Sequence, residues 1–187
     1  MKTIIIQARM NSKRLPGKVM KDLCGKPLIS HVITRAKKSK FIDQVIVATS
    51  VEDIDDPIAA LCGSEGVKCY RGSLDNVLER YANAARESKA TTIVRITADC
   101  PLIDPLVIDE CIGSFEASGG ADYISNVHPK LRTFPRGFDV EVFSLGALEK
   151  AEREATDAYD KEHVTPFILE NKNGNFTLGA TVNAKDA

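Results

Sequence analysis

A run of cations near the N-terminus is the first feature that could do chemistry. Residues 8–18 read ARMNSKRLPGK, which places Arg9, Lys13, Arg14 and Lys18 among small and turn-forming residues. Backbone N–H groups in such a segment can approach a polyphosphate, arginine can hold phosphate oxygens in a bidentate fork, and lysine acts as a mobile point charge. The spacing is not that of a Walker A loop. The segment predicts a phosphate-binding loop, with a plain basic surface as the alternative.

A second loop carries the opposite charge. Asp99 directly follows an apolar run at residues 92–97 and precedes Cys100. Magnesium prefers one or two carboxylates together with phosphates and water, so Asp99 opposite a phosphate-binding loop predicts magnesium-assisted nucleotidyl transfer. An Asp99 that only caps its turn is an equal alternative, and Asp104 is expected to cap the following helix. Cys100 is not expected to be a nucleophile, because its nearest sequence neighbours offer no base.

The charge distribution supports an anionic partner. Residues 1–40 hold eleven Lys and Arg against the single acid Asp22, whereas the whole chain has a net charge of −1, so the other 147 residues sum to −11. Nucleic-acid binding would also explain this bias. We rank it last, because the rest of the chain is acidic and no aromatic residues interleave with the basic ones.

Composition limits the class of protein. The chain has 187 residues with 43% hydrophobic content, which predicts a single domain over residues 1–187. Five cysteines are an odd number without paired CxxC spacing, which argues against a disulfide framework or a zinc site and favours a reducing cytoplasm. The N-terminal apolar run is too short for a signal peptide or a membrane span, so no membrane partner is expected.

Hydrophobic periodicity predicts an α/β fold. Apolar runs rich in β-branched residues alternate with helical patterns, which is typical of a mostly parallel, Rossmann-like sheet in a three-layer sandwich. These predicted strands cover residues 3–8, 45–49, 67–70 and 92–97. Helix starts are predicted at Pro27, Asp56-Pro57, Asp75 and Asp104-Pro105. Ligands of such sheets bind beyond the carboxyl ends of the strands, where the basic loop and Asp99 would meet.

The regular alternation of predicted strands and helices ends after Gly120. Residues 121–144 are interpreted as a substrate-side insertion. Further strands and helices are predicted at 122–126, 138–143, 145–155, 160–170 and 176–182.

Several longer strings add a resemblance to a known family. IIIQARMNSKRLPGKVM, GKPLISHVITR, YRGSLDNVLERY, VRITADCPLIDP, FPRGFDVEVF and EHVTPFI occur in order over nearly the whole chain. Together they resemble the spore coat polysaccharide biosynthesis F type of cytidylyltransferase, within the acylneuraminate cytidylyltransferase superfamily. The resemblance implies a nucleotide-diphospho-sugar transferase fold and transfer of CMP from CTP to an acidic sugar of the nonulosonic type, with release of pyrophosphate, in surface polysaccharide biosynthesis. It does not specify the sugar.

The resemblance also assigns roles to residues. Ala8, Arg9 and Ser12 would approach the nucleotide, and Arg9, Arg14 and Lys18 would serve the triphosphate. Asp99 would bind Mg²⁺, which makes Arg9, Lys18 and Asp99 the expected catalytic group. Arg71, Ser73 and Asp75 of the YRGSLDN turn would lie beside the base or ribose, although Asp75 is also a good N-cap.

The strings RGFDVE and EH are the candidates for binding the acceptor sugar. Arg136 could pair with a carboxylate. Asp139 and Glu141 are two apart on a predicted strand and hence on one face, where they could take hydroxyls or a second metal contact. His163 is interpreted either as a general base or as a helix residue hydrogen-bonded to a neighbour, and His31 is interpreted as structural.

Other interpretations stay open at the level of sequence. Chains that this one resembles usually continue further, through acids that can supply a second metal ligand, so this chain is expected either to be truncated at its C-terminus or to have an incomplete site. A nucleotidyltransferase for another nucleotide or a sugar phosphate is a rival, and so is a non-catalytic nucleotide-binding module. The oligomeric state is also open, with a homodimer as one option.

Overall fold

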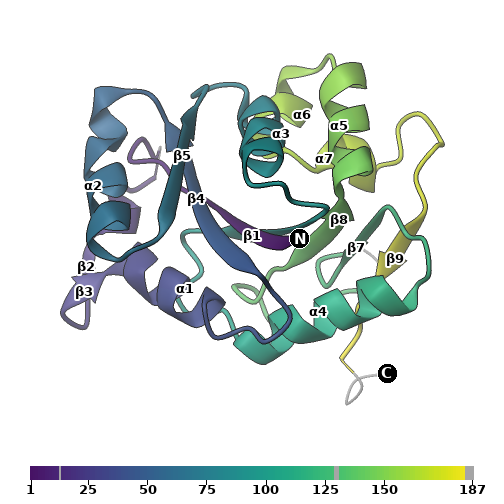
Figure 1. The fold of residues 1–187 in the computed structure, drawn as a ribbon, viewed down its shortest axis with the longest axis horizontal. Helices are drawn as coiled ribbons and strands as arrows, with labels where there is room; N and C mark the ends of the chain where they lie inside the picture. Colours follow the sequence, from purple (N-terminus) through teal and green to yellow (C-terminus); the bar gives the residue numbers. More distant parts are fainter. Residues whose placement is uncertain (13, 129–130, 184–187) are drawn as a thin grey trace.

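The computed structural model describes residues 1–12, 14–128 and 131–183 and is built on a seven-stranded sheet in the order β5-β4-β1-β6-β8-β7-β9 (Figure 1). Strands β5, β4, β1 and β6 are parallel neighbours, whereas β8 is antiparallel to both β6 and β7. The mostly parallel sheet of the prediction is therefore confirmed. The strands are β1 (Lys2–Gln7), β4 (Gln44–Ser50), β5 (Lys68–Gly72), β6 (Thr92–Thr97), β7 (Tyr123–Ser125), β8 (Glu141–Ser144) and β9 (Leu178–Ala180).

Helices cover both faces of the sheet (Figure 1). One layer contains α1 (Leu28–Ala36), α2 (Asp56–Ser64) and α4 (Pro105–Ala117). The other contains α3 (Val77–Glu87), α5 (Leu145–Glu154), α6 (Ala158–His163) and α7 (Pro166–Leu169). Two short 3-10 turns, η1 (Lys18–Met20) and η2 (Asp53–Asp55), follow β1 and β4. The three-layer sandwich predicted from the sequence is confirmed.

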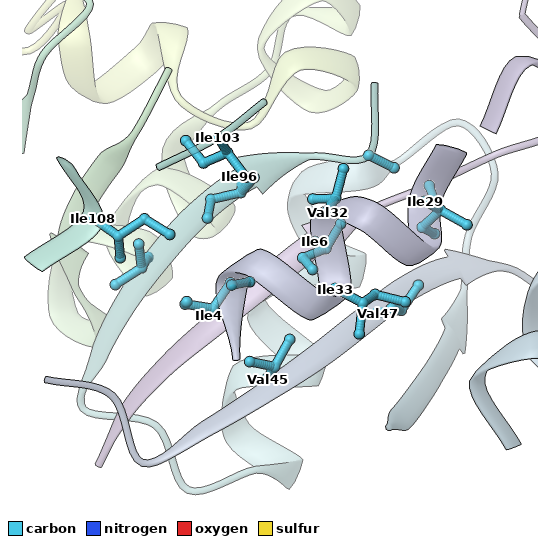
Figure 2. Close-up of a cluster of buried hydrophobic side chains, with 14 of the residues drawn as sticks. Ile4, Ile6, Ile29, Val32, Ile33, Val45, Val47, Ile96, Ile103 and Ile108 are labelled. Carbon is cyan, nitrogen blue, oxygen red and sulfur yellow. The ribbon is translucent and has the colours of Figure 1, made fainter. Parts of the chain in front are cut away.

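Successive side chains along a strand point to opposite faces of the sheet, so the apolar strands contribute to a hydrophobic core on each side. In β1, Ile4 and Ile6 belong to the cluster under α1 and α4, which Figure 2 shows, while Ile5 joins the cluster under α3 and α5. All three side chains are fully buried. Burying a side chain of this size stabilises the fold by about 1.5–3 kcal/mol, so β1 is fixed from both faces and holds its carboxyl end in place.

The predicted capping signals hold for α4 but not for α3. Asp104 caps α4 as predicted, since its carboxylate accepts a hydrogen bond of 2.8 Å from the Leu106 N–H. The predicted Asp75 cap is wrong: Asn76 caps α3 and accepts from the Glu79 N–H at 3.1 Å. Asp and Asn are equally good caps, so the sequence could not choose between two adjacent residues.

A small hairpin between the basic loop and α1 was not predicted. Strands β2 (Asp22–Leu23) and β3 (Lys26–Pro27) pair around Cys24 and Gly25, whose φ angles are 54° and 84°. Two consecutive positive φ angles match a two-residue type I′ hairpin turn. His31 of α1 lies under this hairpin and contacts the Leu23 carbonyl oxygen at 2.7 Å, as expected for a structural histidine.

Two predicted elements near the C-terminus differ from the structure. The strand predicted at 138–143 begins only at Glu141, so Asp139 precedes it. The helix predicted at 160–170 is broken into α6 and α7 at Val164, which has a φ of 73°, just before Pro166. Proline lacks the N–H that a continuous helix would need there. Within the part of the chain that the structure describes, no helix is long and apolar enough to cross a membrane.

Candidate active site

A cavity of about 480 Å³ opens at the carboxyl ends of β1 and β6. It brings together seven residues predicted from the sequence: Ala8, Arg9, Ser12, Arg14, Lys18, Asp99 and His163. The other described residues that line it are Gln7, Val19, Arg95, Thr97, Ala98 and Glu162. Lys13, the remaining cation of the basic loop, lies outside the described residues.

Strand pairing explains why the two loops of opposite charge meet. Strands β1 and β6 are parallel neighbours with Gln7 opposite Thr97, and the Ala98 N–H continues the ladder by donating to the Gln7 carbonyl oxygen at 3.1 Å. Both chains therefore leave the sheet at the same edge. Ligand sites of open α/β sheets lie in this position.

The basic loop folds back so that Lys18 reaches Asp99. Gly17 has a φ of 68°, and its N–H donates to the Met10 carbonyl oxygen at 2.8 Å. The Lys18 ammonium then lies 2.6 Å from Asp99 Oδ2. Partial burial alone would raise the pKa of Asp99, but hydrogen bonds from Lys18 and Thr97 and the Lys18 charge hold that pKa below its usual value. Asp99 is thus an ionised carboxylate at neutral pH.

Asp55, at the end of the 3-10 turn η2, anchors the same loop. Its carboxylate is fully buried and accepts hydrogen bonds from the Met10 N–H at 2.6 Å and from the Ser50 hydroxyl at 2.5 Å. The start of the basic loop is therefore tied to the end of β4. The sequence did not single out Asp55, because the run EDIDD contains four acids with no signal that one of them is buried.

Helix α6 contributes the opposite wall, and Figure 1 shows it beside α3. Glu162 pairs with Arg9, with Oε1 3.1 Å from Nη2, and the ring of the adjacent His163 packs against Tyr159 at a centroid distance of 4.5 Å. Glu162 was missed in the sequence, although it stands in the same EH string as His163. The cationic loop is thus held between two acids, Asp99 and Glu162.

Arg95 lines the cavity and belongs to a charged network, of which Glu141 but not Arg95 was singled out from the sequence. Arg95 of β6 donates from Nε to Gln7 Oε1 at 3.1 Å and pairs through Nη1 with Glu141 of β8. The Tyr123 hydroxyl donates to Glu141 at 2.6 Å. Burial would lower the pKa of Arg95, but the Glu141 carboxylate outweighs it and raises that pKa. The available signal was a single arginine inside the otherwise apolar run TIVRIT.

Several predicted site residues lie outside the described lining of the cavity. Arg71 is engaged elsewhere: it donates to the Ser50 and Glu52 carbonyl oxygens at 2.9 and 3.0 Å and pairs with Asp56 at 2.6 Å. Asp56 is consequently a partner of Arg71 and not the capping acid that the sequence predicted. Asp75 is exposed at the start of α3.

The predicted sugar-binding group is also divided. Arg136 is exposed in a turn, and Asp139 pairs with Arg132 at 2.5 Å. Glu141 is buried and pairs with Arg95, and β8 begins only at Glu141, so the prediction that Asp139 and Glu141 share a strand is wrong. Burial, and then the charge of Asp99, raises the pKa of the Cys100 thiol, which disfavours the thiolate that a nucleophile would require.

The donor set fits a metal ion that arrives with phosphates. Among the described residues, no group of three or more His, Cys, Asp or Glu could hold a metal by itself. Asp99, however, is an ionised carboxylate on the wall of a cavity lined by Arg9, Arg14 and Lys18. Magnesium is commonly bound by one or two carboxylates plus substrate phosphates, so Asp99 is a sufficient protein ligand for such a site.

Comparison with known proteins identifies the family. A family model described as cytidylyltransferase matches residues 3–183. The chain belongs to the cytidylyltransferase family. It is therefore a nucleotidyltransferase, and the resemblance seen in its sequence strings is confirmed.

Curated relatives agree with this family. The chain is 42% identical to the uncharacterized protein MJ1063 of Methanocaldococcus jannaschii over 90% of this chain and 67% of that one. It is 35% identical to the spore coat polysaccharide biosynthesis protein SpsF of Bacillus subtilis, covering 88% and 68%. It is 31% identical to the 3-deoxy-manno-octulosonate cytidylyltransferase of Geobacter metallireducens, covering 89% and 70%. The chain thus spans about two thirds of the length of these relatives.

A solved structure agrees as well. A cytidylyltransferase from Leptospira borgpetersenii superposes with a TM-score of 0.91 at 36% identity and covers 98% of this chain and 76% of its own. This cytidylyltransferase accordingly has the nucleotide-diphospho-sugar transferase fold.

Proposed function

We propose that this cytidylyltransferase transfers CMP from CTP to a hydroxyl of an acidic sugar and releases pyrophosphate. The observation that carries the proposal is the meeting of a cationic loop and an ionised carboxylate across one cavity, with Lys18 2.6 Å from Asp99. The acidic sugar is supported by the names of two relatives, one a 3-deoxy-manno-octulosonate cytidylyltransferase and the other a protein of spore coat polysaccharide biosynthesis. A role in surface polysaccharide synthesis follows from the same support.

The cationic residues would bind and orient the triphosphate. Ala8 and Ser12 offer small side chains and backbone groups, while Arg9, Arg14 and Lys18 offer charge to the phosphate oxygens. The acceptor hydroxyl oxygen forms a new bond to the α-phosphorus, on the side opposite the oxygen that bridges the α- and β-phosphates. The bond from the α-phosphorus to this bridging oxygen breaks, and the oxygen leaves as part of pyrophosphate. Catalysis would come from positioning and from stabilising the charge that develops on the phosphates.

Asp99 would hold a divalent ion, for which we propose Mg²⁺. When bound, such an ion neutralises phosphate charge and polarises the α-phosphoryl group. The lowered pKa of Asp99 keeps the carboxylate ionised for this purpose. His163 at the cavity wall is proposed to accept the proton of the attacking hydroxyl.

We also propose a cytoplasmic location. All five cysteines are free thiols in the structure, as expected for a reducing compartment.

Pyrophosphate release tests the proposed function. The protein is incubated with Mg²⁺, each of CTP, UTP, GTP and ATP, and a panel of 2-keto sugar acids. Release is expected only with CTP and an acid. Release with another nucleotide would replace CTP in the proposal, and tight CTP binding without release from any acid would indicate a non-catalytic nucleotide-binding module.

A further inference from the structure

We propose that Arg95 binds the carboxylate of the acceptor sugar and so selects acidic acceptors. This inference rests on the proposed function and adds a residue to it. None of the residues singled out in the sequence strings is Arg95, and the arginine considered there for this role, Arg136, is exposed outside the described lining of the cavity.

The position of Arg95 is fixed by three adjacent strands. Arg95 stands opposite Ile5 of β1 on one side and opposite Glu141 of β8 on the other. Its guanidinium is bound by Gln7 and by Glu141, and Glu141 is itself held by the Tyr123 hydroxyl at 2.6 Å. A side chain held by strands in this way is preorganised, because its partners cannot move without moving the sheet.

One edge of the guanidinium remains available. The two hydrogen bonds of Arg95 use Nε and Nη1, and Nη2 donates to none of the residues in 1–12, 14–128 and 131–183. The side chain is 14% exposed, and it lines the cavity. A carboxylate in the cavity can therefore accept hydrogen bonds from this edge while Gln7 and Glu141 keep the rest of the group in place.

The charge of the two substrates explains why such a residue is needed. A cavity that already holds a triphosphate repels a second anion. Arg9 and Lys18 of the basic loop pair with Glu162 and Asp99 in the structure and would serve the phosphates of CTP. Arg95 lies on β6, four positions before Asp99, and lines the same cavity from the sheet and not from the basic loop.

The chemistry of the acceptor places its carboxylate near the reaction. In a 2-keto sugar acid, the carboxylate is attached to the anomeric carbon whose hydroxyl attacks the α-phosphorus. The acid group must therefore enter the same cavity as the reacting atoms. Arg95 satisfies this requirement, because it shares that cavity with Asp99.

The test compares an acidic acceptor with its own methyl ester. The panel first identifies an acid that supports pyrophosphate release by the wild-type protein, and the KM of this acid and of its ester are then measured. In Arg95→Met the KM of the acid is expected to rise about 10- to 100-fold, as for the loss of a charge-assisted hydrogen bond, while that of the ester changes little. The affinity for CTP alone is expected to stay within about twofold of wild type.

Two further variants keep the test decisive. Arg95→Met leaves Glu141 buried without its cation, which can prevent folding. The double variant Arg95→Met/Glu141→Gln removes both charges and avoids this problem. It is expected to lose the preference for acid over ester in the same way as Arg95→Met. Arg136→Met is the matched control, because it removes an exposed arginine outside the described lining, and its KM for the acid is expected to be unchanged.

The remaining outcomes separate the two levels of the proposal. An equal loss for acid and ester would make Arg95 a structural residue and overturn the inference while leaving the proposed function intact. A raised KM for the acid in Arg136→Met, together with an unchanged KM for the acid in Arg95→Met, would also overturn the inference and leave the proposed function intact. If no acid supports release with CTP, the proposed function fails and the assignment of Arg95 fails with it.

Discussion

Replacing Lys18 with methionine is expected to tighten the binding of Mn²⁺ to the nucleotide-free protein. The Lys18 ammonium lies 2.6 Å from Asp99 Oδ2, so a metal ion that approaches this carboxylate must first displace the ammonium. Methionine keeps most of the length of the side chain and removes the charge. In the wild-type protein, the metal is accordingly expected to bind well only when CTP draws Lys18 toward its phosphates.

The size of the effect follows from the exposure of the pair. The side chains of Lys18 and Asp99 are 30% and 41% exposed, so solvent screens their attraction. Ion pairs in such positions contribute about 0–1 kcal/mol, and 1 kcal/mol corresponds to about a fivefold change in an equilibrium constant. We therefore expect the dissociation constant of Mn²⁺ to fall about two- to fivefold in Lys18→Met.

The assay is a titration of the paramagnetic resonance signal of free Mn²⁺ at about 0.1 M salt, where long-range charge effects are largely screened. Arg14→Met is the control, because Arg14 lines the same cavity and none of the ion pairs found among the described residues includes it. Asp99→Asn should remove binding in both backgrounds. The argument that Lys18 competes with the metal for Asp99 would be refuted if wild type and Lys18→Met had equal dissociation constants for Mn²⁺. It would also be refuted if Arg14→Met lowered the dissociation constant as much as Lys18→Met.

Three other predictions concern the same cavity. Asp99→Asn should lower pyrophosphate release about 100-fold or more while leaving the circular dichroism spectrum unchanged, and retained turnover would exclude Asp99 as the metal ligand. Asp55→Ala leaves the Met10 N–H without its acceptor, so urea unfolding should show a loss of about 1–3 kcal/mol, accompanied by a higher KM for CTP. Because the pKa of Asp99 is lowered in the folded protein, the Lys18–Asp99 pair stabilises the fold above about pH 4 and loses this effect as the pH falls through the lowered pKa. Thermal melts of wild type and Asp99→Asn should therefore converge on acidification, and a constant difference would contradict this sign.

The sequence predicted the parts of the fold that depend on local pattern. The apolar runs around Ile5 and Val47 predicted strands, and placing both loops at the carboxyl edge correctly joined Lys18 to Asp99. Helical periodicity and capping signals are local, so they also located α3 and α4, with an error of one residue at the cap of α3, whereas they did not reveal the break between α6 and α7 at Val164.

The missed features depend on contacts between distant segments. Arg95 and Glu141 are 46 residues apart and become partners only because β8 pairs with β6, an order that no local pattern specifies. Burial of Asp55 likewise depends on the basic loop crossing the end of β4. Arg136 was favoured because it stands in the RGFDVE string, yet it lies in an exposed turn, since position in a motif carries no information on which way a loop faces.

The reversed direction of β8 gives this fold a route for changing its acceptor. Strand β7 ends, and β8 begins, at the same rim as the loops that follow β1 and β6, because β8 alone among the strands of the described sheet runs against its neighbours. The chain that joins β7 to β8 therefore starts and finishes beside the cavity mouth. The parallel ladder of β5, β4, β1 and β6 does not include this connection, so residues of the connection that project toward the cavity are the place to engineer new sugar preferences while the nucleotide-binding loops stay unchanged.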